Sequence, residues 1–150
     1  MTASLISELA QRYETLPASA PTSTELQAFR DWLRHESQQI TAPIVYVRAE
    51  LKPQETLHEF RQTGRLLVST AHNCHPYFTR CENNLFRAVH DWHHLQIGPD
   101  FTFKGEVCAY LKARSTAPQA IWWILFCEIV AQAAACLHFG EFRPQRMVKF

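Results

Sequence analysis

The sequence lacks an excess of charge of either sign. Lysine and arginine number 15 against 14 aspartates and glutamates, so the formal net charge is +1, and the basic residues form no run. No strong electrostatic field therefore recruits nucleic acid or an anionic membrane, and we expect neither as a partner. Internal repeats and low-complexity segments are also absent, which excludes repeat architectures.

Disulfide patterns and targeting signals are missing as well. The five cysteines are an odd number, and the first residues lack the basic and long apolar regions of a signal peptide. These features favour a reducing cytoplasm. One stretch, 120–139, raises the question of a membrane span, but Glu128 and Gln132 interrupt it, and a span needs about 20 apolar residues. We therefore expect a buried helix of the domain there.

The composition does provide enough apolar material for one core. Hydrophobic residues make up 47% of 150 residues, which suits a single domain over 1–150. Apolar spacing predicts a mainly α bundle of about six helices around the buried apolar helix 120–139, with a motif-bearing core at about 82–140. Two short runs predict at most one small two-stranded β element, and the basic tail is expected on the surface. The predicted segments are helices 4–16, 22–38, 53–63, 85–96, 104–113 and 118–139, strands 43–47 and 66–70, and the tail 143–150.

The densest group of chemically active side chains lies in residues 87–94, which read R-A-V-H-D-W-H-H. His90 and His94 lie one helical turn apart on one face, a common arrangement for two imidazoles on one metal ion. His90 and His93 are three apart and could do the same, so helical spacing does not choose between His93 and His94. Such a pair suits Zn²⁺, Fe²⁺, Mn²⁺ or Ni²⁺ and needs a further ligand. His75 is a candidate extra ligand or proton shuttle.

Two glutamates are candidates for the remaining ligands. Glu128 lies in a helix that is apolar on nearly every side, where an ionised carboxylate is costly without a partner. Gln132 lies one turn further and can hydrogen-bond the site or a bound ligand. Glu106 follows Gly105, which lets the backbone come close at the start of its helix. The predicted metal ligands are His90, His94, Glu106 and Glu128.

Other interpretations of these residues stay open. The cluster could be a structural polar network in a non-catalytic, protein-binding helical domain. Glu128 could pair with Arg87, and Glu106 could be an ordinary first-turn carboxylate favoured by the helix dipole. A second zinc site is conceivable in the segment before the motif, although the spacing is not that of a standard zinc knuckle. Its ligands would be His72, Cys74, His75 and Cys81.

Asp91 has two candidate roles. Residues 90–94 formally read H-D-x-x-H, a variant of the zinc-peptidase motif H-E-x-x-H in which Asp91 would be the general base. Replacing glutamate by aspartate shortens the base by one methylene group, which makes this fit mediocre. In the second role Asp91 holds a histidine from outside the ligand set, or binds Arg87 one turn earlier.

The order of these motifs resembles an uncharacterised bacterial and bacteriophage family. Its members carry an R-A-x-H-D-x-x-G-H motif, then G-E, then E-x-x-x-Q in a later helix. Here 87–91 read R-A-V-H-D, 105–106 read G-E and 128–132 read E-I-V-A-Q. The resemblance covers about 82–132.

The resemblance implies that one site is formed by His90, Asp91, Glu106 and Glu128. It brings no settled activity with it. The chain departs from the pattern at the second histidine, because the family places it where this sequence has Leu95 and places glycine where this sequence has His94. Either His94 or His93 takes over that role, or the ligand set differs.

These patterns together predict a metal-binding helical domain with ligands from three helices. We expect a small metal-dependent enzyme with hydrolase-type chemistry, in which Asp91 and Gln132 act as candidate catalytic residues. The substrate, a small molecule or a peptide, stays open, as does the formation of homo-oligomers.

Overall fold

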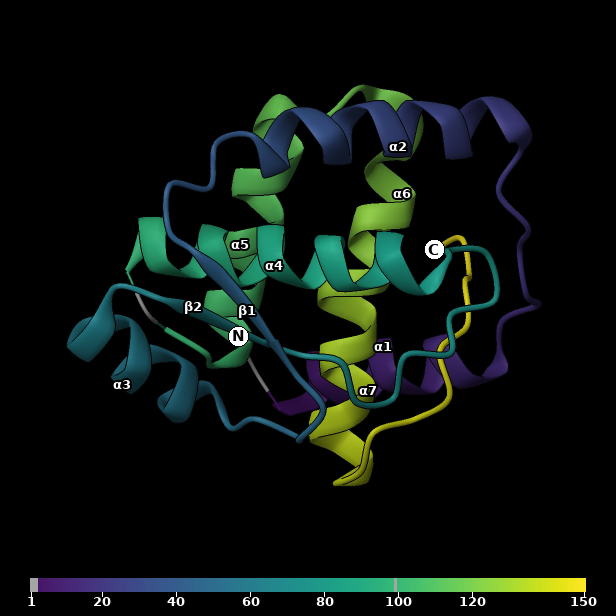
Figure 1. Cartoon of the computed structure of the whole chain (residues 1–150). Coiled ribbons are helices and arrows are strands. Elements are labelled where there is room, and N and C mark those ends of the chain that lie inside the picture. Colours follow the sequence, from purple (N-terminus) through teal and green to yellow (C-terminus); the bar gives the residue numbers. More distant parts are fainter. Residues whose placement is uncertain (1–2, 99) are drawn as a thin grey trace.

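Helices dominate the computed structural model, which describes residues 3–98 and 100–150 (Figure 1). In chain order it contains α1 (Ala3–Thr15), α2 (Ser23–Ser37), β1 (Ile44–Val47), α3 (Pro53–Thr63), β2 (Leu66–Ser69), α4 (Arg80–Ile97) and α5 (Phe103–Thr116). A long apolar helix, Gln119–Phe139, follows. The prediction of a mainly α domain with one small β element is confirmed.

The two strands form a small parallel sheet beside α4. Ile44 lies opposite Leu66 in the register, and α3 connects the strands and packs on β2. Gly64 ends α3 in a left-handed conformation with φ of 72°, as expected for a glycine at this position. The sheet meets α4 through a small apolar cluster that is separate from the main core. The buried members of this cluster are Leu66, Val68 and Ala88.

Helix α4 begins at Arg80, earlier than the predicted start at 85, and its N-cap is Thr79. The Thr79 hydroxyl accepts a hydrogen bond from the backbone N–H of Glu82 at 3.2 Å, and the Glu82 carboxylate accepts one from the Thr79 N–H at 2.7 Å. This reciprocal capping box satisfies two free N–H groups. Glu82 also pairs with Arg30 of α2 at 2.6 Å. The earlier start frees the buried Asn83 side chain for a polar network inside the domain.

The long helix changes its winding along its length. It starts as a 3₁₀ turn, η1 (Gln119–Ile121), continues as α6 (Trp122–Leu125), widens into the π-helical segment η2 (Phe126–Ala131) and ends as α7 (Gln132–Phe139). It is long and apolar enough to cross a membrane, yet 56% of its most apolar window is buried inside the domain. Figure 1 shows it running from beside α2 to α1, behind α4. It packs against α1 and α5 and forms the centre of the core, as predicted.

The prediction that the tail 143–150 lies on the surface is wrong for Met147 and Val148, although the end of the tail is exposed. Met147 and Val148 are buried, with 1% and 0% of their surface exposed. Their burial in the main apolar core outweighs the solvation of the basic residues around them. The guanidinium of Arg146 donates to the backbone oxygen of Leu16 at 2.7 Å, where a helix end leaves carbonyl groups without partners. The tail is therefore tied to the end of α1.

Candidate metal centre and its cavity

Two histidines of α4 converge on one carboxylate of α5. His90 Nε2 lies 3.2 Å from Glu106 Oε2, and His94 Nε2 lies 3.4 Å from the same oxygen. One ligand atom from each residue can be chosen so that all three lie within 4.8 Å of one another. Two imidazoles and one carboxylate form a donor set found in catalytic zinc and non-haem iron sites. The structure therefore brings together a group that could hold a metal ion, and the histidine it pairs with His90 is His94.

The orientation of His94 leaves a free lone pair at this point. Its Nδ1 lies 3.0 Å from the backbone oxygen of Asp100, which can only accept a hydrogen bond, so Nδ1 carries the proton. A neutral His94 then presents an unprotonated Nε2 to Glu106, and this nitrogen is buried without a hydrogen-bond partner. Phe101 stacks on the imidazole with ring centroids 4.8 Å apart. A cation between the two facing acceptors would relieve their repulsion, so the residues fit a metal ion.

Gly105 makes the contact between His94 and Asp100 sterically possible. A Cβ at position 105 would lie 1.7 Å from the Asp100 backbone oxygen, a distance that no side chain tolerates. Thr102 caps α5 and accepts a hydrogen bond from the Gly105 N–H at 3.4 Å. The expected close approach of the backbone at Gly105 is confirmed. The same glycine therefore places Glu106 and admits the carbonyl that orients His94.

Charge interactions hold Glu106 in its anionic form. Burial alone would raise the pKa of Glu106, but the two neighbouring imidazoles, above all the charge of His90, lower it to about 2. Burial likewise opposes protonation of His90, yet the carboxylate of Glu106 raises the pKa of that histidine. The second nitrogen of His90, Nδ1, is buried without a partner. Glu106 is thus ready to bind a cation at neutral pH.

His93 faces a different part of the protein. Its Nε2 lies 2.9 Å from Glu36 Oε2 on α2, and the two side chains are only 2% and 7% exposed. Burial lowers the pKa of His93 in spite of the neighbouring carboxylate. His93, which the sequence left open as a ligand, therefore belongs to the interface between α2 and α4 and lies outside the metal cluster.

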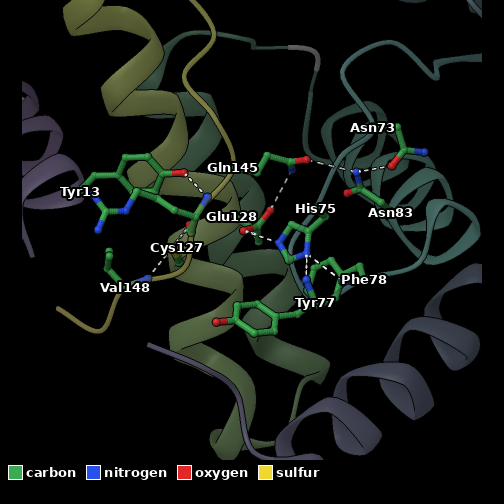
Figure 2. A network of polar contacts seen from close by, with 11 residues as sticks. Tyr13, Asn73, His75, Tyr77, Phe78, Asn83, Cys127, Glu128, Gln145 and Val148 are labelled. Carbon is green, nitrogen blue, oxygen red and sulfur yellow. Dashed lines mark hydrogen bonds and ion pairs between the residues drawn. The ribbon is translucent and has the colours of Figure 1, made fainter. Parts of the chain in front are cut away.

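Glu128, the predicted fourth ligand, also lies outside that cluster. Its Oε1 lies 3.1 Å from His75 Nε2, and its Oε2 accepts a hydrogen bond from Gln145 Nε2 at 3.4 Å (Figure 2). The alternative ion pair with Arg87 is not formed, because the Arg87 guanidinium donates to three backbone oxygens instead. These oxygens belong to Ser69, Ala71 and His72.

Both ring nitrogens of His75 are already engaged. Nδ1 accepts hydrogen bonds from the backbone N–H groups of Tyr77 at 3.1 Å and Phe78 at 2.9 Å. The proton of a neutral imidazole must then reside on Nε2, which donates it to Glu128. The structure therefore offers no lone pair of His75 for a metal ion, and the suggestion that His75 is an extra ligand finds no support in the geometry.

A cavity of about 230 Å³ connects the metal cluster with Glu128. His90 and Glu106 line it together with Glu128 and Gln132 of the long helix. The Gln132 Nε2 is buried and has no hydrogen-bond partner. A purely structural polar network would be closed and internally satisfied. The cavity and the unpartnered nitrogens argue against that alternative. The remaining lining residues are Asn83, Phe86, Arg87, Ile129, Ala133, Cys136, Phe142 and Gln145.

Asp91 is not part of the cluster. Within residues 3–98 and 100–150 it makes no side-chain hydrogen bond or ion pair, and burial raises its pKa to about 6 against the opposing charges of His90 and His94. The zinc-peptidase interpretation requires Asp91 beside the ion as a base. The carboxylate that faces the two imidazoles is that of Glu106, not that of Asp91.

The four residues of the conceivable second zinc site do not converge. In the described part of the chain the cluster around His90 is the one group of ligands with metal spacing. Cys74 and Cys81 are exposed thiols, and His72 contacts Glu50 at the surface.

Sequence reasoning missed three contributors to the site. Gln145 lies in the tail, Asn83 lies near the start of α4 and contacts Gln145, and Asp100 contributes through its backbone oxygen. Their side-chain types and sequence neighbours carry no signal of these contacts, which depend on how distant segments pack.

Comparison with known proteins adds no assignment. No family model, no curated protein and no solved structure matches this chain. The functional argument therefore rests on the geometry of the site.

Proposed function

We propose that this protein is a small metal-dependent enzyme with hydrolase-type chemistry. His90, His94 and Glu106 would hold one divalent ion, and the observation that carries the proposal is the buried, unpartnered Nε2 of His94 facing the Glu106 carboxylate. A divalent ion supplies Lewis-acid chemistry that polarises a substrate oxygen or activates water. Zn²⁺, Fe²⁺, Mn²⁺ and Ni²⁺ all accept such ligands.

The residues around the ion would each have a distinct task. Asp100 fixes His94 through the hydrogen bond to Nδ1, which is how metal-binding histidines are usually oriented. Gln132 lines the cavity with a free amide N–H, which can donate to an oxygen atom of a substrate. A cavity of about 230 Å³ suits a small molecule or the side chain of a peptide.

Metal analysis of protein purified without chelator tests this proposal. We expect about one ion per chain and loss of that ion in His90→Ala and in Glu106→Gln. His58→Ala, which removes an exposed histidine of α3, is the matched control and should keep the metal. A metal-free protein whose thermal stability is unchanged by Zn²⁺, Mn²⁺, Fe²⁺ or Ni²⁺ would overturn the proposal.

The resemblance to the bacterial and bacteriophage family remains part of this proposal, supported by the order of the motifs in 82–132. A cytoplasmic location and the absence of nucleic-acid and membrane partners likewise stay predictions from composition. Separation of the soluble and membrane fractions of cells that express the native protein would test the location.

A further inference from the structure

We propose that Glu128 is the proton acceptor of the cavity and that His75 is the residue that positions it. The inference rests on the proposed metal site, because it assigns the chemistry opposite that site. The two side chains are almost fully enclosed, with 0% of His75 and 2% of Glu128 exposed. Their Nε2–Oε1 distance is 3.1 Å.

The first support is the fixed tautomer of His75. Two backbone N–H groups, from Tyr77 and Phe78, donate to Nδ1 and exclude a proton there. The ring also stacks on Phe78, with centroids 3.8 Å apart and an interplanar angle of 9°. His75 therefore acts as a neutral N–H donor that orients the carboxylate of Glu128.

The second support is a chain of neutral amides on the other carboxylate oxygen. Asn83 Nδ2 donates to Gln145 Oε1 at 3.4 Å and to Asn73 Oδ1 at 2.7 Å. Because the Gln145 oxygen is thus engaged, its NH₂ group points to Glu128 Oε2 (Figure 2). Both oxygens of Glu128 are held without a cation, while Arg87 in the cavity wall is occupied by backbone oxygens.

The third support is the location of Glu128. It lies in the π-helical segment η2, and such segments are frequent at functional sites. It lines the same cavity as His90 and Glu106, so a molecule in that cavity would have both the proposed metal ligands and the Glu128 carboxylate in its walls.

In a hydrolysis the step would run as follows. One O–H bond of a water molecule breaks, Glu128 takes the proton, and the freed electron pair forms a bond to the electrophilic carbon or phosphorus of the substrate. The leaving group departs with the electron pair of its own bond and recovers the proton from Glu128. No oxidant or reductant is consumed.

Binding of acetohydroxamic acid to the Zn²⁺-loaded protein tests the role of Glu128, because this probe loses a proton when it binds a metal. Calorimetry in two buffers of different ionisation enthalpy counts the protons released to solution. We expect little release from the wild type, and about one proton more together with about tenfold weaker binding in Glu128→Gln. Glu36→Gln, which changes a buried glutamate paired with a histidine outside the cavity, should behave like the wild type.

The role of His75 needs its own readout. His75→Phe should weaken probe binding in the same direction as Glu128→Gln, and His75→Gln, which keeps an N–H donor, should restore it in part. Long-range ¹⁵N–¹H NMR on the metal-free protein should place the proton of His75 on Nε2. This measurement does not depend on metal, probe or the folding of a variant.

Several results would overturn the inference. These are equal affinity and proton release in wild type and Glu128→Gln, no probe binding to the Zn²⁺-loaded wild type at millimolar concentration, or an Nδ1–H tautomer of His75. Failure of the wild type to take up Zn²⁺ is seen before the probe is added and refutes the metal site itself. If Glu128→Gln does not fold, the pair His75→Phe and His75→Gln decides: equal binding in both refutes the positioning role.

Discussion

Helix α4 carries two adjacent histidines, His93 and His94, that contact glutamates in different surroundings. His93 meets Glu36 in a closed interface with α2, where both side chains are nearly inaccessible to water. His94 meets Glu106 of α5 beside a cavity, and its Nε2 has no hydrogen-bond partner. The two residues are adjacent in sequence, but a helix turns by about 100° per residue and directs them to different neighbours.

The comparison teaches what distinguishes a candidate metal site from a structural histidine pair. Both pairs are buried contacts between an imidazole and a carboxylate, so burial and residue type do not separate them. The difference lies in a third possible ligand, His90, and in the backbone oxygen of Asp100, which directs the lone pair of His94 Nε2 toward Glu106. Convergence and orientation of lone pairs therefore decide the function.

The largest effect on stability is expected from breaking the buried pair of His93 and Glu36. His93→Ala leaves the Glu36 carboxylate buried without its partner, which should lower the free energy of unfolding by about 3 kcal/mol. Metal content should not change. Urea denaturation of the metal-free protein and metal analysis of the native protein measure the two quantities. If His93→Ala lost the metal with little loss of stability, His93 would be the metal ligand and His94 the structural residue.

His94→Ala is the reciprocal test on the cavity side. Removing one of three ligands should weaken metal affinity by more than about 100-fold. Mutation of a residue that only orients a ligand typically weakens metal affinity by about 10- to 100-fold. The stability of the metal-free protein should fall less than in His93→Ala, because Glu106 keeps its contact with His90 whereas Glu36 loses its histidine partner. Competition with a chromogenic chelator measures the affinity, with the exposed His138→Ala as control. Unchanged affinity would exclude His94 as a ligand.

Gly105→Ala tests the orientation of His94 without touching a ligand. The new methyl group would force the Asp100 carbonyl away from its present position. We expect metal affinity to fall about 10- to 100-fold and stability to fall by about 1–3 kcal/mol. Lys104→Ala, an exposed change in the same turn, is the control and should leave both unchanged. Normal affinity in Gly105→Ala would show that the Asp100 contact does not matter for metal binding.

The smallest effect concerns acid stability of the metal-free protein. The pKa of Glu106 is lowered from its ordinary value of 4.5 to about 2, so its stabilisation is complete above pH 4.5 and is lost as the pH falls toward 2. Glu106→Gln should remove about 2 kcal/mol of this dependence, after allowance for partial solvent exposure of the carboxylate. Urea denaturation between pH 5 and pH 2 with EDTA would show it. Exposed Glu8→Gln is the control, and identical pH profiles of wild type and Glu106→Gln would contradict the pairing.

Much of the fold could be predicted because local signals agreed with packing. The apolar run 120–139 is too continuous for a surface helix, and Gly64 ends a helix at a position where a left-handed residue is needed. The tail 143–150 could not be predicted. Its charges suggest the surface, whereas the burial of Met147 and Val148 depends on a space that other segments create.

The sequence by itself determined that His90 and one neighbouring histidine share a helix face, and that Gly105 would bring the backbone close before Glu106, because helical periodicity and the absence of a Cβ are local properties. Only the tertiary structure selected His94, since the choice depends on which helix lies opposite each imidazole. It also separated Glu128 from the ligand cluster, paired it with His75 and placed it in the wall of the same cavity as His90 and Glu106. Contacts between distant segments follow from packing in three dimensions, which no local pattern encodes.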